Sequence, residues 1–245
     1  MTVTDLFSGI GGFSLGFTAA GHTLTHYSET DPFCSKIMQR NWPTATNLGD
    51  IHNVNETTTE IVTAGPPCQP ISRSGKRKAE DDPRWLWDHL IRIAARSKPR
   101  WLVIEQPLGI LDIPNRGIDW ILYNLAGIHY TTWVYHLSGP NVGSPTYRKR
   151  IFILAHAPGI RQQGRMQEPT PRPTPATKTR QLPAPQMLYP WPPRPRQIGQ
   201  IPIATDGLPA RLPGRADKLK AIGNAVMPQL AYLLAMTINH METTL

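Results

Sequence analysis

The sequence predicts an α/β fold organised around a doubly wound, mostly parallel sheet. Short apolar, β-favouring runs alternate with stretches of helical periodicity as far as about residue 154. Turns rich in glycine or proline directly follow several of these runs, at the edge where sheets of this kind bind ligands. The 245 residues, 40% of them hydrophobic, fit one large domain with its own core.

The first predicted strand, residues 3–7, runs into a glycine turn. This turn contains Gly9, Gly11 and Gly12, and helical periodicity follows it as far as Gly21. Because glycine has no Cβ, the backbone N–H groups of such a turn can approach a ligand closely. The alternative is a tight turn that binds nothing.

Carboxylates follow the next predicted strand, residues 23–28. Glu29 lies about 20 residues past the glycines, where dinucleotide-binding folds hold a ribose hydroxyl. Asp31 precedes Pro32 at the start of a predicted helix, a pattern typical of an N-cap. We therefore assign Glu29 to a ribose and Asp31 to the cap. Asp50, in the following turn, either accepts from the amino group of an adenine or is an ordinary turn aspartate.

A double proline ends the apolar run at residues 61–64 and places Cys68 on a stiff loop at the carboxyl end of a strand. The basic residues of 73–78 follow at once, and such cations can lower the pKa of a thiol or bind phosphate. A lone cysteine is otherwise usually a small, inert core residue. We predict that Cys68 is a nucleophile and that Cys34 belongs to the core.

The alternation continues through the second half of the chain. The expected elements are a helix at 85–97, a strand at 101–104, a helix at 118–125, and strands at 131–137 and 151–154. Glu105 directly follows four apolar residues, a position that solvation explains poorly, so we predict a functional carboxylate there. Arg148 and Arg150 lead into the last of these strands.

Composition changes at residue 157. The stretch 157–203 is rich in proline, lacks periodicity and carries one acidic residue against Arg161, Arg165, Arg172, Lys178, Arg180, Arg194 and Arg196. We predict an extended basic arm that contacts nucleic acid, with Tyr189 and Trp191 available for stacking; a flexible linker is the alternative. An apolar helix from 229 to 241 closes the chain.

Charge and cysteine content narrow the class of protein. The net charge of +9 and the pI of about 9.8 favour a polyanionic partner. Two cysteines fit a reducing compartment, and the spacing of cysteine and histidine offers no metal site. The start of the chain lacks the pattern of a secretory signal, and we expect no apolar run to reach the length of a membrane span. We expect a soluble, cytoplasmic monomer without a metal.

Five motifs resemble, in order, those of the cytosine-C5 DNA methyltransferases. They are residues 5–13 (DLFSGIGGF), residues 65–70 (GPPCQP), Glu105, residues 148–150 (RKR) and residues 223–226 (GNAV). The resemblance implies a Rossmann-like methyltransferase with a catalytic and cofactor-binding domain at 1–156. It also implies a short Pro-rich target-recognition segment at 157–205 and a C-terminal segment, 206–245, that returns to the catalytic domain.

The resemblance implies methyl transfer from S-adenosyl-L-methionine to C5 of a flipped cytosine in double-stranded DNA. Cys68 would add to C6. Glu105 would bind N3 and the exocyclic amine, and Arg150 would bind O2, with Arg148 placing Cys68 or a phosphate. The implied cofactor-binding residues are Phe7, Gly9, Gly11, Gly12, Glu29, Asp50, Pro67 and Asn224. The setting would be a bacterial or phage-infected cell, in restriction–modification, phage protection or regulation.

The chain departs from the family pattern in three places. Gln106 and Pro107 stand where the family has Asn-Val, Thr146 and Tyr147 replace the usual pair before Arg148, and the target-recognition stretch is short. Three alternatives stay open, of which the first would keep every one of these catalytic residues. They are an RNA (tRNA) cytosine-C5 methyltransferase, a non-catalytic DNA-binding descendant of the enzyme, and a thiol oxidoreductase that uses Cys68.

Overall fold

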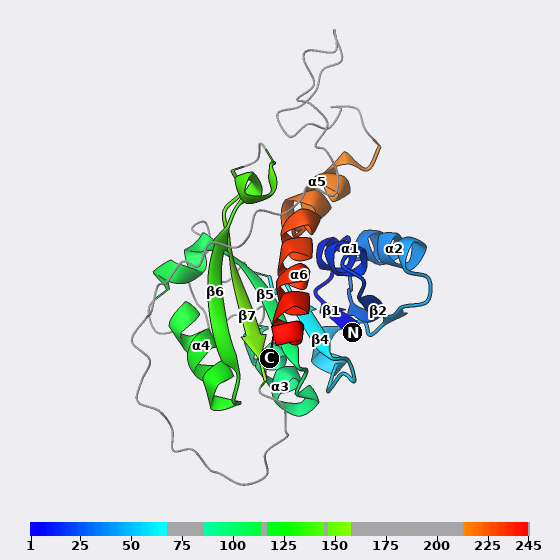
Figure 1. Ribbon diagram of the computed structural model, residues 1–245. Coiled ribbons are helices and arrows are strands. Elements are labelled where there is room, and N and C mark those ends of the chain that lie inside the picture. Colours follow the sequence, from blue (N-terminus) through cyan, green and yellow to red (C-terminus); the bar gives the residue numbers. More distant parts are fainter. Residues whose placement is uncertain (68–85, 114–116, 145–146, 158–212, 245) are drawn as a thin grey trace.

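The computed structural model describes residues 1–67, 86–113, 117–144, 147–157 and 213–244. These residues form one seven-stranded sheet with helices on both faces (Figure 1). The strands are β1 (Thr2–Leu6), β2 (Thr23–Ser28), β3 (Thr46–Asn47), β4 (Ile61–Ala64), β5 (Trp101–Pro107), β6 (Thr131–Leu137) and β7 (Arg150–His156). The α-helices are α1 (Gly12–Ala19), α2 (Pro32–Asn41), α3 (Trp87–Ser97), α4 (Ile118–Gly127), α5 (Arg215–Asn224) and α6 (Pro228–Thr244).

The strand order is β3-β2-β1-β4-β5-β7-β6, and the predicted doubly wound, mostly parallel sheet is confirmed. The pairs among β1 to β5 are parallel, whereas β7 runs antiparallel to both β5 and β6. Pro107, at the end of β5, pairs with Arg150, at the start of β7. The carboxyl ends of the parallel strands and the amino end of β7 therefore share one edge of the sheet.

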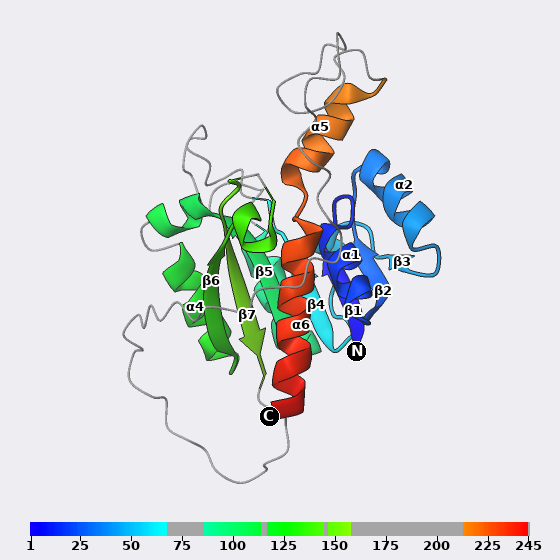
Figure 2. The same ribbon diagram turned by 45° about the horizontal axis from the view of Figure 1, so that its top comes forward.

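Two apolar cores cover the two faces of the sheet. One core contains buried side chains of α1 and α6, and the other contains buried side chains of α3 and α4. Figure 2 shows α6 crossing the sheet beside α1, with α4 behind β6. This three-layer arrangement leaves the shared strand edge as the place where loops from both halves of the chain meet.

Helix α2 begins as the sequence predicts. Asp31 is its N-cap, and the Asp31 carboxylate accepts hydrogen bonds from the backbone N–H groups of Phe33 and Cys34. Pro32 occupies the first helical position, where its missing N–H costs nothing. Cys34 is buried, as expected for a core residue.

Strand β5 is longer than predicted. The sequence places its end at residue 104, but antiparallel pairing with β7 continues through Pro107. Glu105 is therefore the fifth residue of a seven-residue strand, and not the first residue of a loop. The extension has a physical cause, because β7 supplies hydrogen-bond partners that β4, which pairs only as far as Ile104, does not.

Helices α5 and α6 close the chain. By length and composition alone, Arg215–Thr244 is apolar enough for a membrane span, contrary to the expectation from the sequence. The helical pattern is broken at 225–227, and α6 buries Leu230, Leu234 and Ile238, among others, against the sheet. Its apolar side chains thus belong to the core of the domain.

Helices α1 and α6 pack closely because α1 carries two glycines on the contact face. A Cβ on Gly16 would lie 2.5 Å from the Pro228 carbonyl oxygen and 2.6 Å from the Ala231 Cβ. A Cβ on Gly12 would overlap the Val226 carbonyl in the same way. These contacts hold the segment before α6 against the first turn of α1.

We predict that Gly16→Ala lowers the free energy of unfolding by about 1–3 kcal/mol, because the added methyl group meets backbone atoms that cannot move aside cheaply. Urea unfolding followed by circular dichroism measures the change. Gly127→Ala is the matched control, since a Cβ at that helical position has no neighbour within 4 Å and alanine favours helix. Equal midpoints for Gly16→Ala and wild type would contradict the prediction.

Candidate active site

The glycine turn joins β1 to α1 at the shared edge of the sheet. Phe7, Gly9 and Gly11 have φ angles of 57°, 54° and 85°, so the backbone passes through the left-handed region three times in five residues. A Cβ on Gly9 would have no neighbour within 4 Å, which leaves space beside the backbone there. Gly11 instead faces the Trp42 ring, 2.5 Å from a Cβ in its place. Of the predicted glycines, Gly9 thus borders open space, whereas Gly11 and Gly12 also serve packing.

Glu29 links this turn to the start of α2. One carboxylate oxygen accepts from the Gly9 N–H at 2.7 Å, and the other accepts from the N–H groups of Thr30 and Asp31 at 2.8 and 2.7 Å. A carboxylate has about four acceptor positions, so these three bonds leave room for a hydroxyl donor. The predicted ribose residue is therefore half-buried beside Gly9, with its carboxylate fixed by backbone donors.

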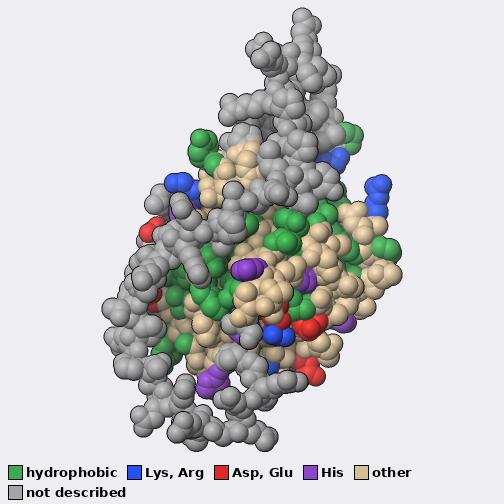
Figure 3. All heavy atoms as spheres, in the orientation of Figure 1, with side chains coloured by type: hydrophobic (Ala, Val, Ile, Leu, Met, Phe, Trp, Pro, Cys, Tyr) green, Lys and Arg blue, Asp and Glu red, His purple; other side chains and the backbone are tan. Residues whose placement is uncertain are grey.

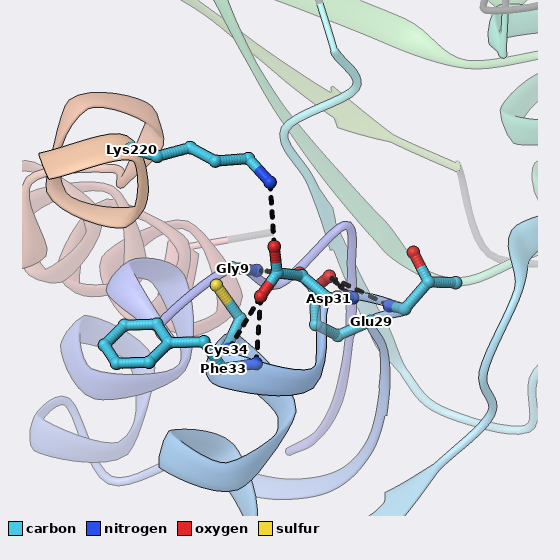
Figure 4. A network of polar contacts seen from close by, with 7 residues as sticks. Gly9, Glu29, Asp31, Phe33, Cys34 and Lys220 are labelled. Carbon is cyan, nitrogen blue, oxygen red and sulfur yellow. Dashed lines mark hydrogen bonds and ion pairs between the residues drawn. The ribbon is translucent and has the colours of Figure 1, made fainter. Parts of the chain in front are cut away.

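A second polar link ties α5 to this region (Figure 4). Lys220 Nζ lies 2.8 Å from the Asp31 carboxylate oxygen that does not cap α2. The hydrogen bond from Lys220, together with the N–H of Cys34, holds the pKa of Asp31 below its usual value. Asp31 therefore does more than the predicted capping, because it also anchors the helix that leads to Asn224. Nothing in the residue types around Lys220 predicted this contact.

The remaining predicted cofactor residues lie along the same edge, but their partners differ. Asp50 is exposed and accepts from the backbone N–H of His52 at 3.0 Å and from the His52 ring at 2.6 Å. These bonds lower its pKa and fit the ordinary turn aspartate that the sequence left open. Pro67 is exposed, and Asn224 is exposed at the end of α5.

A buried carboxyl lies beneath the glycine turn, and the sequence pattern did not predict it. Asp5 is 1% exposed and accepts from the Ser14 N–H at 3.2 Å, the Ser14 hydroxyl at 2.6 Å and the Thr63 hydroxyl at 2.7 Å. It thereby joins the first turn of α1 to β4. Burial raises its pKa to about 7, although these hydrogen bonds oppose the shift. The available signal was a charge within the otherwise buried run of residues 3–6.

Glu105 and Arg150 form an ion pair at the opposite side of the edge. Arg150 Nε lies 2.7 Å from Glu105 Oε1, and Glu105 is only 7% exposed. Burial raises the pKa of Glu105, while the positive charges of Arg150 and Arg148 oppose the rise. The structure thus brings Glu105 and Arg150, two of the predicted site residues, together. Arg148 instead donates to the backbone carbonyl of Ile222, 3.3 Å away, at the end of α5.

The base of the predicted nucleophile loop meets this pair. A Cβ on Gly65 would lie 4.0 Å from Glu105 Oε2 and 4.0 Å from the Val226 side chain. Gln106 Nε2 donates to the Pro66 carbonyl at 2.9 Å. Cys68, like the arm of residues 158–212, lies outside the described residues. Those described contain no cluster of three or more His, Cys, Asp or Glu side chains placed to hold a metal.

The family model for C-5 cytosine-specific DNA methylases matches residues 1–190. The chain belongs to this family. The chain is 36% identical over 165 residues to the type II methyltransferase M.HgiBI of Herpetosiphon aurantiacus, covering 65% of this chain and 37% of the relative. It is 32% identical over 200 residues to M.AquIA of Picosynechococcus sp., covering 73% of this chain and 79% of that protein.

A solved structure of a candidate DNA modification methyltransferase, encoded within an E. coli prophage, shares the fold of this chain. The TM-score is 0.55 at 24% identity, with 64% of this chain and 47% of that chain covered. Members of the family use S-adenosylmethionine. The chain spans less than two thirds of the M.HgiBI sequence.

The raised pKa of Asp5 predicts a pH-dependent stability. In the folded state the Asp5 carboxyl stays protonated up to about pH 7, whereas in the unfolded chain it loses its proton near pH 4. The stability that protonated Asp5 contributes is therefore complete below pH 4 and is lost as the pH rises through 7. A shift of this size corresponds to about 4 kcal/mol at most. We expect the free energy of unfolding of Asp5→Asn, relative to wild type, to rise from pH 4 to pH 7.5.

Denaturant unfolding of both proteins at several pH values checks this prediction. Asp88→Asn, at an exposed carboxyl on α3, is the control and should run parallel to wild type. Parallel curves for Asp5→Asn and wild type would show that Asp5 does not carry the effect.

Proposed function

We propose that this protein transfers a methyl group from S-adenosyl-L-methionine to C5 of cytosine in DNA, through a covalent bond between Cys68 and C6. The observation that carries the proposal is the position of Glu105. Glu105 is a buried carboxyl with a raised pKa, and Arg150 forms an ion pair with it. It also lies next to Gly65, and Gly65 stands three residues before Cys68 in the sequence. The same sheet edge bears the glycine turn.

Cys68 supplies the nucleophile in this mechanism. Cytosine C5 is too poor a nucleophile to take a methyl group directly, and addition of a thiolate to C6 gives it enamine character. Loss of the C5 proton and expulsion of the thiolate then restore the aromatic ring. The target base must leave the helix stack to reach the sheet edge, so base flipping accompanies the reaction.

Glu105 assists the addition step. Cytosine N3 gains negative charge as the thiolate adds, and a carboxyl that stays protonated to a higher pH than usual can donate a hydrogen bond to it. Arg150 fixes the position of Glu105, and we assign to it the contact with O2 of the same base. Arg148 packs against the end of α5, so we assign it to placement of this wall.

The residues present fit the cofactor. When bound, S-adenosylmethionine supplies an activated methyl group on a sulfonium centre. Gly9 leaves open space beside its backbone, and Glu29 keeps an acceptor position for a ribose hydroxyl. Gly12 allows Val226, which follows Asn224, to close against the turn. We assign Phe7, Pro67 and Asp50 to the remaining contacts.

The charge distribution supports DNA as the substrate. The described residues contain 12 Lys or Arg and 12 Asp or Glu, so they are neutral, and the whole net charge of +9 lies outside them. Figure 3 shows the described Lys and Arg side chains scattered singly over this face. Residues 158–212 alone carry six of the nine excess charges. A basic segment on a neutral catalytic domain suits a phosphate backbone.

We assign the DNA contacts to this arm. Its last described neighbour on one side, Ala157, donates to the Arg100 carbonyl at the far edge of the sheet. On the other side the chain resumes in α5, which Lys220 ties to the cofactor edge. The described residue before the arm thus lies at the far edge of the sheet, and the helix after the arm lies on the side where the base must enter. The type II methyltransferases among its relatives favour a restriction–modification role in a bacterial or phage-infected cell.

We predict that replacing Arg172, Lys178, Arg180, Arg194 and Arg196 by Gln weakens DNA binding and flattens its salt dependence. Binding to each phosphate releases a counterion, so the slope of log K against log salt should become shallower by up to about 0.9 for each phosphate that the variant no longer binds. Fluorescence anisotropy with labelled duplex at several salt concentrations measures the slope. Replacing five exposed cations of the described domain by Gln instead controls for charge alone, at Lys36, Arg40, Arg96, Lys98 and Arg100. An unchanged slope in the arm variant would favour the linker.

The covalent mechanism predicts a trapped complex on DNA that contains 5-fluorocytosine. Fluorine cannot leave as a cation, so after methyl transfer the bond from Cys68 to C6 persists and survives denaturing electrophoresis. Cys68→Ser should abolish both the adduct and methylation while cofactor binding remains. Glu105→Gln should slow adduct formation by about 10²–10⁴-fold, the usual contribution of an acid–base group.

The duplexes must cover many sequence contexts because the target is open. Absence of any cofactor-dependent adduct, in contexts where ordinary cytosine is methylated, would overturn the covalent step. Faster methylation of tRNA than of DNA would favour the RNA enzyme, and cofactor-independent DNA binding without methylation would favour a non-catalytic descendant. An adduct that forms without the cofactor would favour simple thiol chemistry.

A further inference from the structure

We propose that Gln106 is a positioning residue that holds the base of the Cys68 loop through the carbonyl of Pro66. The inference rests on the proposed function, because the position of this loop matters to activity only if Cys68 is the nucleophile. It assigns a role to the residue that replaces the family's asparagine after Glu105.

The double proline creates the need for such a residue. Strands β4 and β5 pair in parallel as far as Ala64 and Ile104, and the same register would next place Pro66 beside Gln106. Gly65 still donates to the Leu6 carbonyl at 3.4 Å. Neither proline has an N–H, so the ladder cannot continue beyond that point.

Gln106 takes over where the ladder stops. Its side-chain Nε2 donates to the Pro66 carbonyl at 2.9 Å, which substitutes a side-chain donor for the missing backbone partner. Pro66 is buried and Gln106 is 1% exposed, so water does not compete for this bond. A buried carbonyl deprived of this donor would remain unpaired, which costs more than the hydrogen bond itself contributes.

The other end of the amide points to a further bond. Gln106 Oε1 is buried and has no hydrogen-bond partner in the part of the chain that the structure describes. Burying the Gln106 amide with an unpaired acceptor costs free energy, so packing alone does not explain a glutamine at this position. Its placement is explained if it serves the segment that begins at Pro66.

The connection from Pro66 to Cys68 is short and stiff. Pro66 and Pro67 have fixed φ angles, so a shift at the Pro66 carbonyl is transmitted along the backbone towards Cys68. Bond formation requires the sulfur and C6 to meet in a narrow geometry, and a displacement of about 1 Å can cost about 10²-fold in rate. Gln106 therefore affects the covalent step without touching the base, whereas its neighbour Glu105 faces it.

The test compares Gln106→Met with Tyr130→Phe. Methionine keeps the volume and removes the donor. The Tyr130 hydroxyl also donates to a buried proline carbonyl, that of Pro99 at 2.6 Å, but at the opposite end of β5. Both variants should lower the urea midpoint. At saturating DNA and cofactor, only Gln106→Met should slow the single-turnover rate of adduct formation on 5-fluorocytosine duplex, by about 10²-fold. The cofactor Kd should stay unchanged in both.

Equal adduct rates for the two variants would overturn the inference, as would a loss confined to cofactor affinity. If Gln106→Met does not fold, Gln106→Leu replaces it under the same criterion, since leucine is apolar, no larger than glutamine and has no hydrogen-bond donor. The proposed function fails separately, when the wild-type protein itself neither methylates DNA nor forms an adduct. A working wild type with an unaffected Gln106 variant refutes only the positioning role.

Discussion

The reversal of a single strand determines which edge of the sheet carries the candidate active site. Because β7 runs against β5, its first residue starts where β5 ends, and Arg150 meets Glu105 across the pair. In an all-parallel sheet the start of a neighbouring strand would lie at the far edge, some 20 Å away for a strand of about six residues. The antiparallel strand β7 thus places Arg150, from the later part of the chain, at the same edge of the sheet as the glycine turn that follows β1.

Much of this arrangement follows from local sequence. The runs that became β1 and β4 are short and are followed closely by glycine, β2 is rich in β-favouring residues, and Asp31 before Pro32 has the pattern of an N-cap. Other features depend on contacts between distant segments. No local pattern shows that β5 continues past Ile104, because β7 supplies the partners, or that Asp5 is buried with Ser14 and Thr63. Cys68 lies outside the described residues, so its predicted role as the nucleophile stays a prediction.

The polar contacts at the sheet edge form two groups on either side of α5. Lys220 ties this helix to Asp31 and so to the half that carries Glu29, whereas Arg148 bonds its last turn to the half that carries Glu105. The exposed ion pair on one side contributes little to stability, but it fixes an orientation. The helix that follows the basic arm is therefore in contact with both halves of the edge, and any displacement of α5 moves groups in both.

The glycine contact between α1 and α6 can form only after almost the whole chain has been synthesised. More than 200 residues separate Gly12 from Pro228, yet the first turn of α1 rests against the segment just before α6. At ribosomal rates of about 5–20 residues per second, the nascent N-terminal segment waits for about ten seconds or more before that surface emerges. Until then the face of α1 that carries Gly12 and Gly16 has no helix to pack against. A chain that ends before α6 therefore exposes apolar surface of α1 and lacks the segment at Val226 that covers the first turn of α1. Contacts of such sequence separation also slow folding, which makes this pairing a late event in the folding of the protein.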